Sequence, residues 1–238
     1  MKALILAAGR GTRISRFLNG KPKCIVDIRG IELIRYTVEL LKKKGISNIG
    51  VVLGYQAEMV KGCLFDKKVE FFTNPFFDVT NSIASVWFAK NFFSNDDDYL
   101  IMNGDVFLEE RIIIDVLKTE VSPVMYADES RKEEADYKFY YENNVLKKYG
   151  KNLTGEDITG EYIGIARLNC DFIPKFLSKL DQMIDIQQHS LWWENVLYEL
   201  TKESNIFVQD IRGMFWAEVD YIEDYFRIMN YRDSQSYL

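Results

Sequence analysis

The sequence contains a single histidine, His189, with no serine or cysteine motif to accompany it, so a catalytic triad is not expected. Its three cysteines (Cys24, Cys63 and Cys170) lie far apart and form no CxxC pair, which argues against a disulfide framework or a zinc site. No apolar run approaches the roughly 18 residues that span a bilayer, and the N-terminus has no secretory cleavage signal. We therefore expect a cytoplasmic protein that does not insert into a membrane.

Acidic residues are missing from the first 26 positions, although the whole chain has a net charge of −6. A local positive pocket in an acidic protein suits a small polyanion, whereas a nucleic acid would need a broad basic surface. We expect no nucleic-acid partner. The basic residues of this stretch are Lys2, Arg10, Arg13, Arg16, Lys21 and Lys23.

The order of apolar segments predicts one α/β domain over residues 1–238. Up to about residue 126, strands alternate with helices, which predicts a doubly wound, mostly parallel, Rossmann-like sheet with ligands beyond the carboxyl ends of its strands. This part is the expected nucleotide-binding core, residues 1–126. The predicted strands are 2–8, 48–54, 69–73, 99–103 and 122–127. The predicted helices are 33–44, 56–64, 82–93 and 109–118.

The pattern changes after about residue 128. Residues 136–150 predict two antiparallel strands around an Asn143-Asn144 turn, followed by a strand at 161–168 and helices at 191–202 and 221–231. We therefore expect residues 127–238 to add a small antiparallel acceptor-side layer and a metal-binding strand.

The first predicted strand ends in Ala7-Ala8-Gly9-Arg10-Gly11-Thr12-Arg13, whose small residues let backbone amides approach phosphate oxygens. A dinucleotide-binding turn or a simple tight turn would also fit two glycines. However, the third glycine of the dinucleotide motif is absent, and Gly20-Lys21-Pro22 interrupts the helix that should follow. The motif GxxxxGK[ST] is absent as well, which excludes a P-loop.

Charged residues at three places in the chain complete a phosphoryl-transfer pattern. Lys23 follows a proline soon after the glycine loop and could neutralise charge on a reacting phosphorus, although a solvated lysine is the default. Asp105 ends an apolar strand in Asn103-Gly104-Asp105 and could hold Mg²⁺ or simply form a turn. In Glu218-Val219-Asp220 the two carboxylates share one strand face, and Asp220 could be a second metal ligand or a helix cap.

With LAAGRGTR…KPK, NGD and EVD in this order, the chain resembles the nucleotidyltransferases that make nucleoside-diphosphate-activated metabolites. TNSIASVW, LWWEN and WAEVDYIEDY are similar to segments of the phosphocholine-type cytidylyltransferases. DYKF…KKYGKNL…GEYIGI is similar to relatives that act on other small phosphorylated or phosphonylated acceptors. After Arg13 the chain departs from the usual Leu-x-Pro-x-Thr and has Ile-Ser-Arg-Phe-Leu.

The resemblance implies that an acceptor phosphate attacks the α-phosphorus of CTP, giving a CDP-linked product and pyrophosphate. It implies that Lys23 and Arg13 stabilise the transition state and that Asp105 and Asp220 bind Mg²⁺. The implied nucleotide-binding residues are Leu6, Ala7, Ala8, Gly9, Arg10, Gly11, Thr12, Asn81, Ser82, Ser85 and Gly104. The implied acceptor-binding residues are Lys151, Glu161, Tyr162, Trp193, Glu194 and Trp216.

The residues implied for nucleotide binding and for acceptor binding also have purely structural explanations. Thr80, Asn81 and Ser82 could read a cytosine edge or merely cap the following helix. Trp192, Trp193, Phe215 and Trp216 could box a quaternary ammonium with Glu194, although any one aromatic residue is more often part of a core.

The leading hypothesis is a monomeric or homodimeric cytidylyltransferase that uses phosphocholine, a phosphoglutamine-like compound, aminoethylphosphonate or inositol phosphate, for the decoration of surface polysaccharide. A sugar-1-phosphate nucleotidyltransferase is the alternative, which Gly160-Glu161-Tyr162 keeps open. A silent nucleotide-binding module is disfavoured because Lys23, Asp105 and Asp220 are all present. A redox protein with a Rossmann fold is the remaining alternative, and such a protein would bind a nicotinamide cofactor.

Overall fold

The structure is a computed structural model that describes residues 1–14 and 17–235, so Arg16 of the basic N-terminal stretch lies outside the described residues. The strands are β1 (Lys2–Ala7), β2 (Ile49–Leu53), β3 (Glu70–Thr73), β4 (Tyr99–Asn103), β5 (Val106–Leu108), β6 (Val124–Asp128), β7 (Lys138–Glu142), β8 (Val145–Gly150), β9 (Gly160–Leu168), β10 (Phe207–Asp210) and β11 (Trp216–Glu218). The α-helices are α1 (Leu33–Lys43), α2 (Ala57–Cys63), α3 (Ser82–Phe88), α4 (Glu110–Lys118), α5 (Ile173–Asp185), α6 (Glu194–Leu200) and α7 (Ile222–Gln235).

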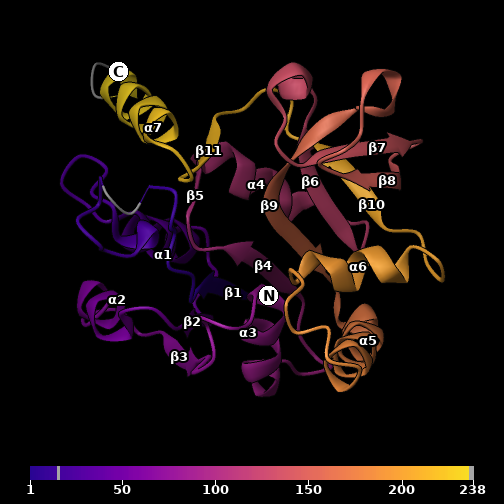
Figure 1. The fold of residues 1–238 in the computed structure, drawn as a ribbon, viewed down its shortest axis with the longest axis horizontal. Helices are drawn as coiled ribbons and strands as arrows, with labels where there is room; N and C mark the ends of the chain where they lie inside the picture. The colour runs from indigo at the N-terminus through magenta and orange to yellow at the C-terminus, as the bar shows by residue number, and fades with distance from the viewer. Residues whose placement is uncertain (15–16, 236–238) are drawn as a thin grey trace.

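Nine strands form one sheet in the order β3-β2-β1-β4-β9-β6-β10-β8-β7, with helices on both faces (Figure 1). Helices α3, α5 and α6 cover one face through Ile83, Phe176 and Val196. Helices α1, α2 and α4 cover the other face, where Ile34 and Val60 belong to the second core. Strand β1 is buried from Ala3 to Ala7, because a central strand needs apolar residues on both faces.

The prediction of a mostly parallel, doubly wound sheet is only partly right. Strands β3, β2, β1 and β4 are parallel, as expected. Strand β9, however, runs antiparallel to both of its neighbours, β4 and β6. The chain returns to the sheet from the β7–β8 hairpin without a crossover helix, and a strand reached in this way runs antiparallel. The hairpin belongs to the same sheet instead of forming a layer of its own: β8 pairs with β10, and β7 pairs with both β8 and β9.

A second, two-stranded sheet pairs β5 with β11, two segments that lie more than 100 positions apart in the sequence. A third apolar cluster beside it includes Phe107, Val219 and Ile228 and anchors α7 against this small sheet. Figure 1 shows α7 next to β11 and above α1. This packing fixes the segment that follows β11, which carries Asp220.

Several element boundaries differ from the predictions. Helix α3 ends at Phe88 and a short 3-10 helix, η2 (Lys90–Phe92), follows, while α6 begins only at Glu194. Helix α5 and strands β5 and β10 were not predicted. Among residues 1–14 and 17–235, no helix is both long enough and apolar enough to cross a membrane.

Candidate active site

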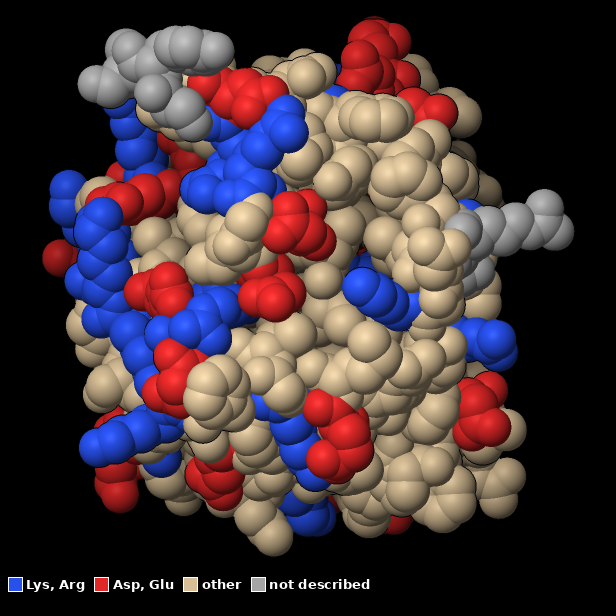
Figure 2. All heavy atoms as spheres, turned by 90° about the vertical axis from the view of Figure 1, so that its left-hand side faces the viewer, with Lys and Arg blue, Asp and Glu red and all other residues tan. Residues whose placement is uncertain are grey.

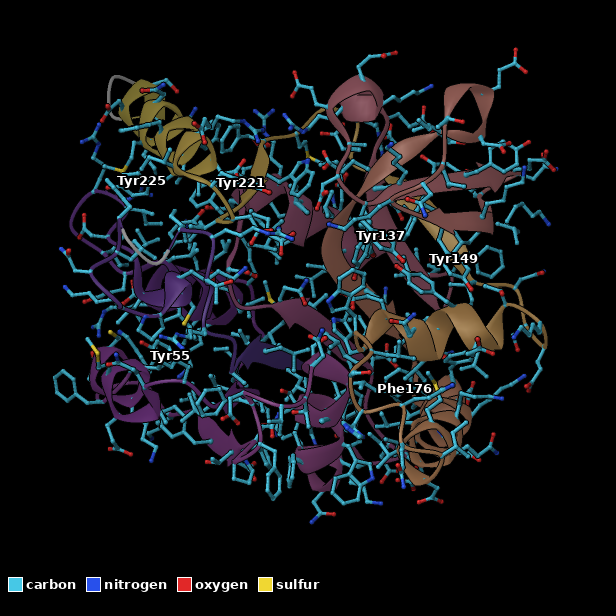
Figure 3. All side chains as sticks on the ribbon, in the orientation of Figure 1. Tyr55, Tyr137, Tyr149, Phe176, Tyr221 and Tyr225 are labelled. Atoms are coloured by element: carbon cyan, nitrogen blue, oxygen red, sulfur yellow. The ribbon has the colours of Figure 1, made fainter. Side chains whose placement is uncertain are left out.

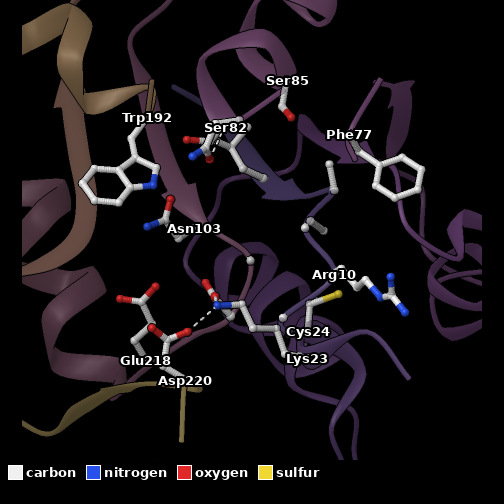
Figure 4. Close-up of a pocket in the computed structure, with 18 of the residues that line it drawn as sticks. Arg10, Lys23, Cys24, Phe77, Ser82, Ser85, Asn103, Trp192, Glu218 and Asp220 are labelled. Carbon is white, nitrogen blue, oxygen red and sulfur yellow. Dashed lines mark hydrogen bonds and ion pairs between the residues drawn. The ribbon is translucent and has the colours of Figure 1, made fainter. Parts of the chain in front are cut away.

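A cleft of about 730 Å³ opens beyond the carboxyl ends of β1 and β4. Its lining comes from the glycine loop, from the segment between β3 and α3, and from residues of β9, α6 and β11 that lie far along the chain. In Figure 4, Phe77 and Trp192 lie on opposite sides of the cleft, with Asn103 between them and Lys23, Glu218 and Asp220 below. The chain therefore forms the predicted cavity at the predicted edge of the sheet.

Two glycines allow the close packing at the centre of this cleft. Gly11 has a φ of +65°, and a Cβ atom there would lie 2.9 Å from Cδ of Lys23. At Gly104 a Cβ atom would lie 2.8 Å from the carbonyl oxygen of Leu6, with which the Gly104 amide forms a hydrogen bond. The glycine loop, the lysine and the end of β4 can therefore approach one another closely.

Three carboxylates meet at one point of the cleft. Asp105, Glu218 and Asp220 offer oxygen atoms that all lie within 4.8 Å of one another. The β5–β11 ladder places Val106 opposite Glu218, and the Val219 amide donates a 3.0 Å hydrogen bond to the carbonyl of Asp105. Backbone pairing thus explains how residues distant in the sequence form one acidic cluster.

The ammonium group of Lys23 lies inside this cluster. It forms an ion pair with Asp105 and another with Asp220, at 2.7 Å from Oδ1. Burial lowers the pKa of Lys23, but the charges of Asp105, Glu218 and Asp220 outweigh burial and raise it above its usual value. Lys23 is therefore held protonated at neutral pH.

The surroundings shift the pKa values of the two carboxylates of the β11 segment in opposite directions. Burial and the neighbouring Asp105 raise the pKa of Glu218 well above its usual value. Burial also acts to raise the pKa of Asp220, but Lys23 and Arg13 hold it below its usual value. The raised pKa of Glu218 reflects a crowding of carboxylates that the Lys23 ammonium does not fully offset, and such crowding suits a further cation.

The two described arginines of the glycine loop lie at different edges of the cleft. Nη1 of Arg13 is 2.5 Å from Oδ2 of Asp220, and its guanidinium lies 5.6 Å from the centre of the Tyr221 ring. The guanidinium of Arg10 lies 5.4 Å from the centre of the Tyr55 ring, away from the acidic cluster. Both side chains border the cavity and present positive charge to an anion within it.

The side chains beyond the loop are organised by a buried residue, Asn74. Its Nδ2 donates hydrogen bonds to the hydroxyls of Thr80, at 3.0 Å, and Ser85, at 3.1 Å. The Asn81 side chain accepts the Ser82 amide at 2.8 Å, so it does cap α3. The Ser82 hydroxyl accepts the amide of Trp193. All five hydroxyl and amide residues also line the cleft, so capping and ligand contact are compatible here.

Aromatic residues form the opposite wall. Tyr137 packs edge-on against Trp192 with ring centres 5.5 Å apart, and Tyr198 stacks on both Tyr137 and Tyr149. Figure 3 shows Tyr137 and Tyr149 together on the side of the β7–β8 hairpin that faces α6. The ammonium of Lys151 lies 5.9 Å from the centre of the Trp192 ring and 2.6 Å from Oδ2 of Asp136.

A buried carboxylate, Glu194, completes this wall. Burial, assisted by the charge of Asp105, raises the pKa of Glu194 to about 7. Nδ2 of Asn103 lies 3.4 Å from the Glu194 carboxylate, while the Trp193 indole donates to the other side of the Asn103 amide at 3.0 Å. The cleft therefore has a charged centre flanked by a polar side and an aromatic side.

The structure brings most of the predicted site residues to this cleft and places three elsewhere. Trp193 is fully buried, and the indole of Trp216 donates to the carboxylate of Asp128. Glu161 accepts hydrogen bonds from Arg131 and from the Asp136 amide. None of these three side chains lines the cleft. The predicted residues that do line it are Leu6, Ala7, Ala8, Gly9, Arg10, Gly11, Thr12, Arg13, Lys23, Asn81, Ser82, Ser85, Gly104, Asp105, Lys151, Tyr162, Glu194 and Asp220.

Sequence reasoning missed several lining residues. Asn74 was visible only as a polar residue at the end of a strand, before Pro75. Tyr137 lies in the DYKF segment but was not assigned to the site, and Tyr198 lies in no motif. Glu218 was noted beside Asp220 but not assigned to the metal set. Only the pairing of β5 with β11 puts Glu218 beside Asp105.

The basic residues do not form one continuous patch on the face that Figure 2 shows, because acidic side chains lie among them. The positive charge that concerns the cleft is instead concentrated in a few residues around the carboxylates. This distribution is consistent with a small anionic ligand.

Residues 3–156 match the profile of the MobA-like NTP transferase domain. The chain is 26% identical to the CTP:phosphoglutamine cytidylyltransferase of Campylobacter jejuni, over 94% of this chain and 97% of that protein. It is also 26% identical to the choline-phosphate cytidylyltransferase of Streptococcus pneumoniae, over 94% of this chain and 95% of that protein.

Two solved structures share the fold. The CTP:phosphocholine cytidylyltransferase from Streptococcus pneumoniae superposes with a TM-score of 0.78 at 21% identity, covering 97% of this chain and 98% of that one. The inositol-1-phosphate CTP transferase from T. maritima superposes with a TM-score of 0.78 at 17% identity, covering 96% and 94%. The overall fold is thus shared by proteins whose names give different acceptors.

Proposed function

The chain belongs to the MobA-like NTP transferase family, and on this premise we propose that it transfers CMP from CTP to a small phosphorylated or phosphonylated metabolite. The products are a CDP-linked metabolite and pyrophosphate. The observation that carries the proposal is the meeting of Lys23 with Asp105, Glu218 and Asp220 beside the glycine loop. The full-length similarity to two cytidylyltransferases supports CTP as the donor.

The residues present fit a divalent metal. The three carboxylates offer hard oxygen ligands, and the Lys23 ammonium already occupies a cation position between two of them. Asp105 and Asp220 would hold Mg²⁺, with Glu218 at its side. The metal, when bound, would neutralise charge on the triphosphate and on the departing pyrophosphate.

The protein's own residues align the two substrates and neutralise charge on the triphosphate. The backbone of Gly9 to Gly11 cradles the triphosphate, and Arg13 adds a forked charge at its edge. Lys23, kept protonated by its carboxylate partners, stabilises the negative charge that develops on the α-phosphoryl group. No nucleophile from the protein is needed, because the acceptor phosphate is anionic at neutral pH and attacks in line.

We assign the two ends of the cleft to the two substrates. Residues 1–126 supply the nucleotide end, where Thr80, Asn81, Ser82 and Ser85 contact the cytosine or ribose. Residues 127–238 supply the acceptor end, with Lys151, Tyr162, Trp192 and Glu194. We extend the proposal to a cytoplasmic monomer or homodimer that activates a building block for surface-polysaccharide decoration.

A sugar-1-phosphate acceptor finds less support. The glutamate of the Gly160-Glu161-Tyr162 segment is held by Arg131 at 2.9 Å and does not line the cleft. A hexose has many hydroxyls to satisfy, whereas the acceptor wall here is largely aromatic. This wall favours a small head group on a short chain.

One screen tests the proposal: pyrophosphate release with Mg²⁺, each nucleoside triphosphate, and a panel of acceptors. The panel contains choline phosphate, aminoethylphosphonate, inositol phosphate, a phosphorylated amide and hexose 1-phosphates. We expect release with CTP and a non-sugar acceptor, and its loss in Asp105→Asn but not in the surface control Lys21→Ala. A preference for UTP or dTTP with a hexose 1-phosphate would replace the proposal with the sugar alternative. Nucleotide binding without turnover would indicate a silent module.

A further inference from the structure

Two tyrosine hydroxyls at the acceptor end of the cleft have no hydrogen-bond partner among the described residues. They belong to Tyr162, on β9, and Tyr198, on α6, and both side chains line the cleft although they are almost fully buried. An unpaired buried hydroxyl lowers the stability of the fold, because it loses its hydrogen bonds to water and forms none within the protein. Their position in a ligand cavity indicates that a group of the ligand forms the missing hydrogen bonds.

Each hydroxyl faces a polar group that it does not reach with normal hydrogen-bond geometry. The Tyr162 hydroxyl has the Glu194 carboxylate as a polar neighbour and the Tyr198 hydroxyl has that of Tyr137, but neither pair meets the geometry of a hydrogen bond. The Asn103 amide approaches Glu194 only at 3.4 Å, a long contact. This corner of the cleft therefore holds several polar atoms that are close together and incompletely bonded.

We propose that these hydroxyls and Glu194 bind an acceptor whose head group carries N–H donors, either a primary ammonium or a primary amide, and not a quaternary ammonium. The proposal rests on the function proposed above and concerns the acceptor end of the same cleft. A primary ammonium has three N–H donors and a primary amide has two, and Glu194 and the two phenols each offer an oxygen atom that can accept one of them.

A quaternary ammonium would fit this corner poorly. Its methyl groups donate no conventional hydrogen bond, so both phenols would stay unpaired when it binds. The aromatic rings of Tyr137, Trp192 and Tyr198 could still attract any cation. Attraction by the ring faces alone therefore does not distinguish the two kinds of head group, whereas the phenol oxygens do.

The test is a methylation series that removes N–H donors one at a time. With CTP and Mg²⁺, kcat/KM is measured for phosphoethanolamine, its N-methyl and N,N-dimethyl derivatives, and phosphocholine. A second arm compares the phosphate ester of glycolamide with that of its N,N-dimethyl amide. We expect kcat/KM to fall by about tenfold or more from the first to the last member of at least one arm. The arm with the larger loss identifies the head group.

Two variants connect the preference to the hydroxyls. Tyr162→Phe and Tyr198→Phe should each reduce the ratio of kcat/KM between the N–H acceptor and its fully methylated counterpart, by roughly threefold or more. Tyr140→Phe is the matched control, because the Tyr140 hydroxyl bonds to Glu142 on the exposed side of β7 and should leave the ratio unchanged. Without ligand, neither test variant should lower the unfolding midpoint, since each removes an unpaired hydroxyl.

The outcomes separate this proposal from the one before it. A kcat/KM that is constant or rises with methylation overturns the N–H donor proposal and leaves the cytidylyltransferase proposal in place. A preference that persists in both phenylalanine variants shows that the hydroxyls do not read the head group. No pyrophosphate release with any acceptor overturns the proposed function and this inference together.

Discussion

Replacing Lys23 by methionine removes the positive charge of the acidic cluster while keeping a side chain of similar length. The stem of Lys23 packs against Gly11, so methionine preserves that contact better than alanine would. What the substitution takes away is the ammonium that pairs with Asp105 and, at 2.7 Å, with Asp220. Asp105, Glu218 and Asp220 are then left without their main counter-charge.

The size of the effect follows from the geometry. At an effective dielectric constant of about 20, opposite unit charges about 4 Å apart attract by about 4 kcal/mol. Removing one partner of a buried pair typically costs about 3–5 kcal/mol of folding free energy. We therefore expect Lys23→Met to unfold about 3 kcal/mol more easily in the absence of metal. Loss of one positioned charge in the transition state should also lower kcat by about 10²- to 10³-fold.

Mg²⁺ provides the decisive comparison. Since the Lys23 ammonium occupies a cation position within the cluster, its removal should let Mg²⁺ stabilise the variant more than it stabilises the wild type. Urea unfolding with and without Mg²⁺, together with pyrophosphate release, measures both effects, and Lys21→Ala is the control. Wild-type turnover by Lys23→Met would refute the catalytic role. Equal stabilisation of both proteins by Mg²⁺ would show that metal and ammonium do not share the carboxylates.

Three further substitutions test other parts of the site. Gly104→Ala forces a Cβ atom to within 2.8 Å of the Leu6 carbonyl, and urea unfolding should show a free energy of unfolding lower by about 1–3 kcal/mol. Gly62→Ala is the control, because Gly62 lies in α2 with open space around it and its substitution should not lower the free energy of unfolding. Asn74→Ala releases the Thr80 and Ser85 hydroxyls and should raise the KM for CTP several-fold in steady-state assays, with kcat less affected. Glu194→Gln should stabilise the protein above neutral pH: the folded pKa of about 7 exceeds the unfolded value, so the wild type loses about 3 kcal/mol as pH rises from 4.5 to 7. Unfolding at pH 5 and pH 8 checks this, and an equal effect at both values would contradict it.

The donor end of the cleft was accessible from the sequence because its determinants are local. Gly9, Gly11 and Lys23 lie within one short stretch, and their spacing alone predicts a phosphate loop followed by a lysine. Asp105 follows an apolar strand directly, so its place at the carboxyl edge of the sheet needs no tertiary information. The structure puts all four beside one cleft.

The order and direction of the later strands could not be predicted in the same way. The middle of β9, Tyr162 to Ala166, is apolar on both faces, which identifies a central strand but gives no direction. Its antiparallel place between β4 and β6 depends on the β7–β8 hairpin that precedes it. Likewise, β5 is only three residues long, and its pairing with β11 is a long-range contact without a periodic signal.

The acceptor end depends on this long-range arrangement. Tyr137, Tyr162, Glu194 and Tyr198 come from the start of a hairpin, a central strand and a helix, and only the sheet order makes them neighbours. Tryptophans are more conspicuous in the sequence, yet Trp193 and Trp216 use their indole N–H groups to hold Asn103 and Asp128. Trp193 thus positions a polar group of the cleft without lining the cleft itself, whereas Asp128, the partner of Trp216, does not line the cleft.

This difference between the ends has a chemical consequence. The donor end is fixed by backbone geometry and by a charge cluster in which Lys23, Asp105 and Asp220 depend on one another, so most changes there should abolish transfer. The acceptor end is built from side chains that lie beside the β7–β8 hairpin, on β9 and on α6. There, Tyr162→Phe or Tyr198→Phe removes one oxygen atom without disturbing the charges. We therefore expect changes in acceptor preference to arise from substitutions in residues 137–198, while the reaction at the α-phosphorus stays the same.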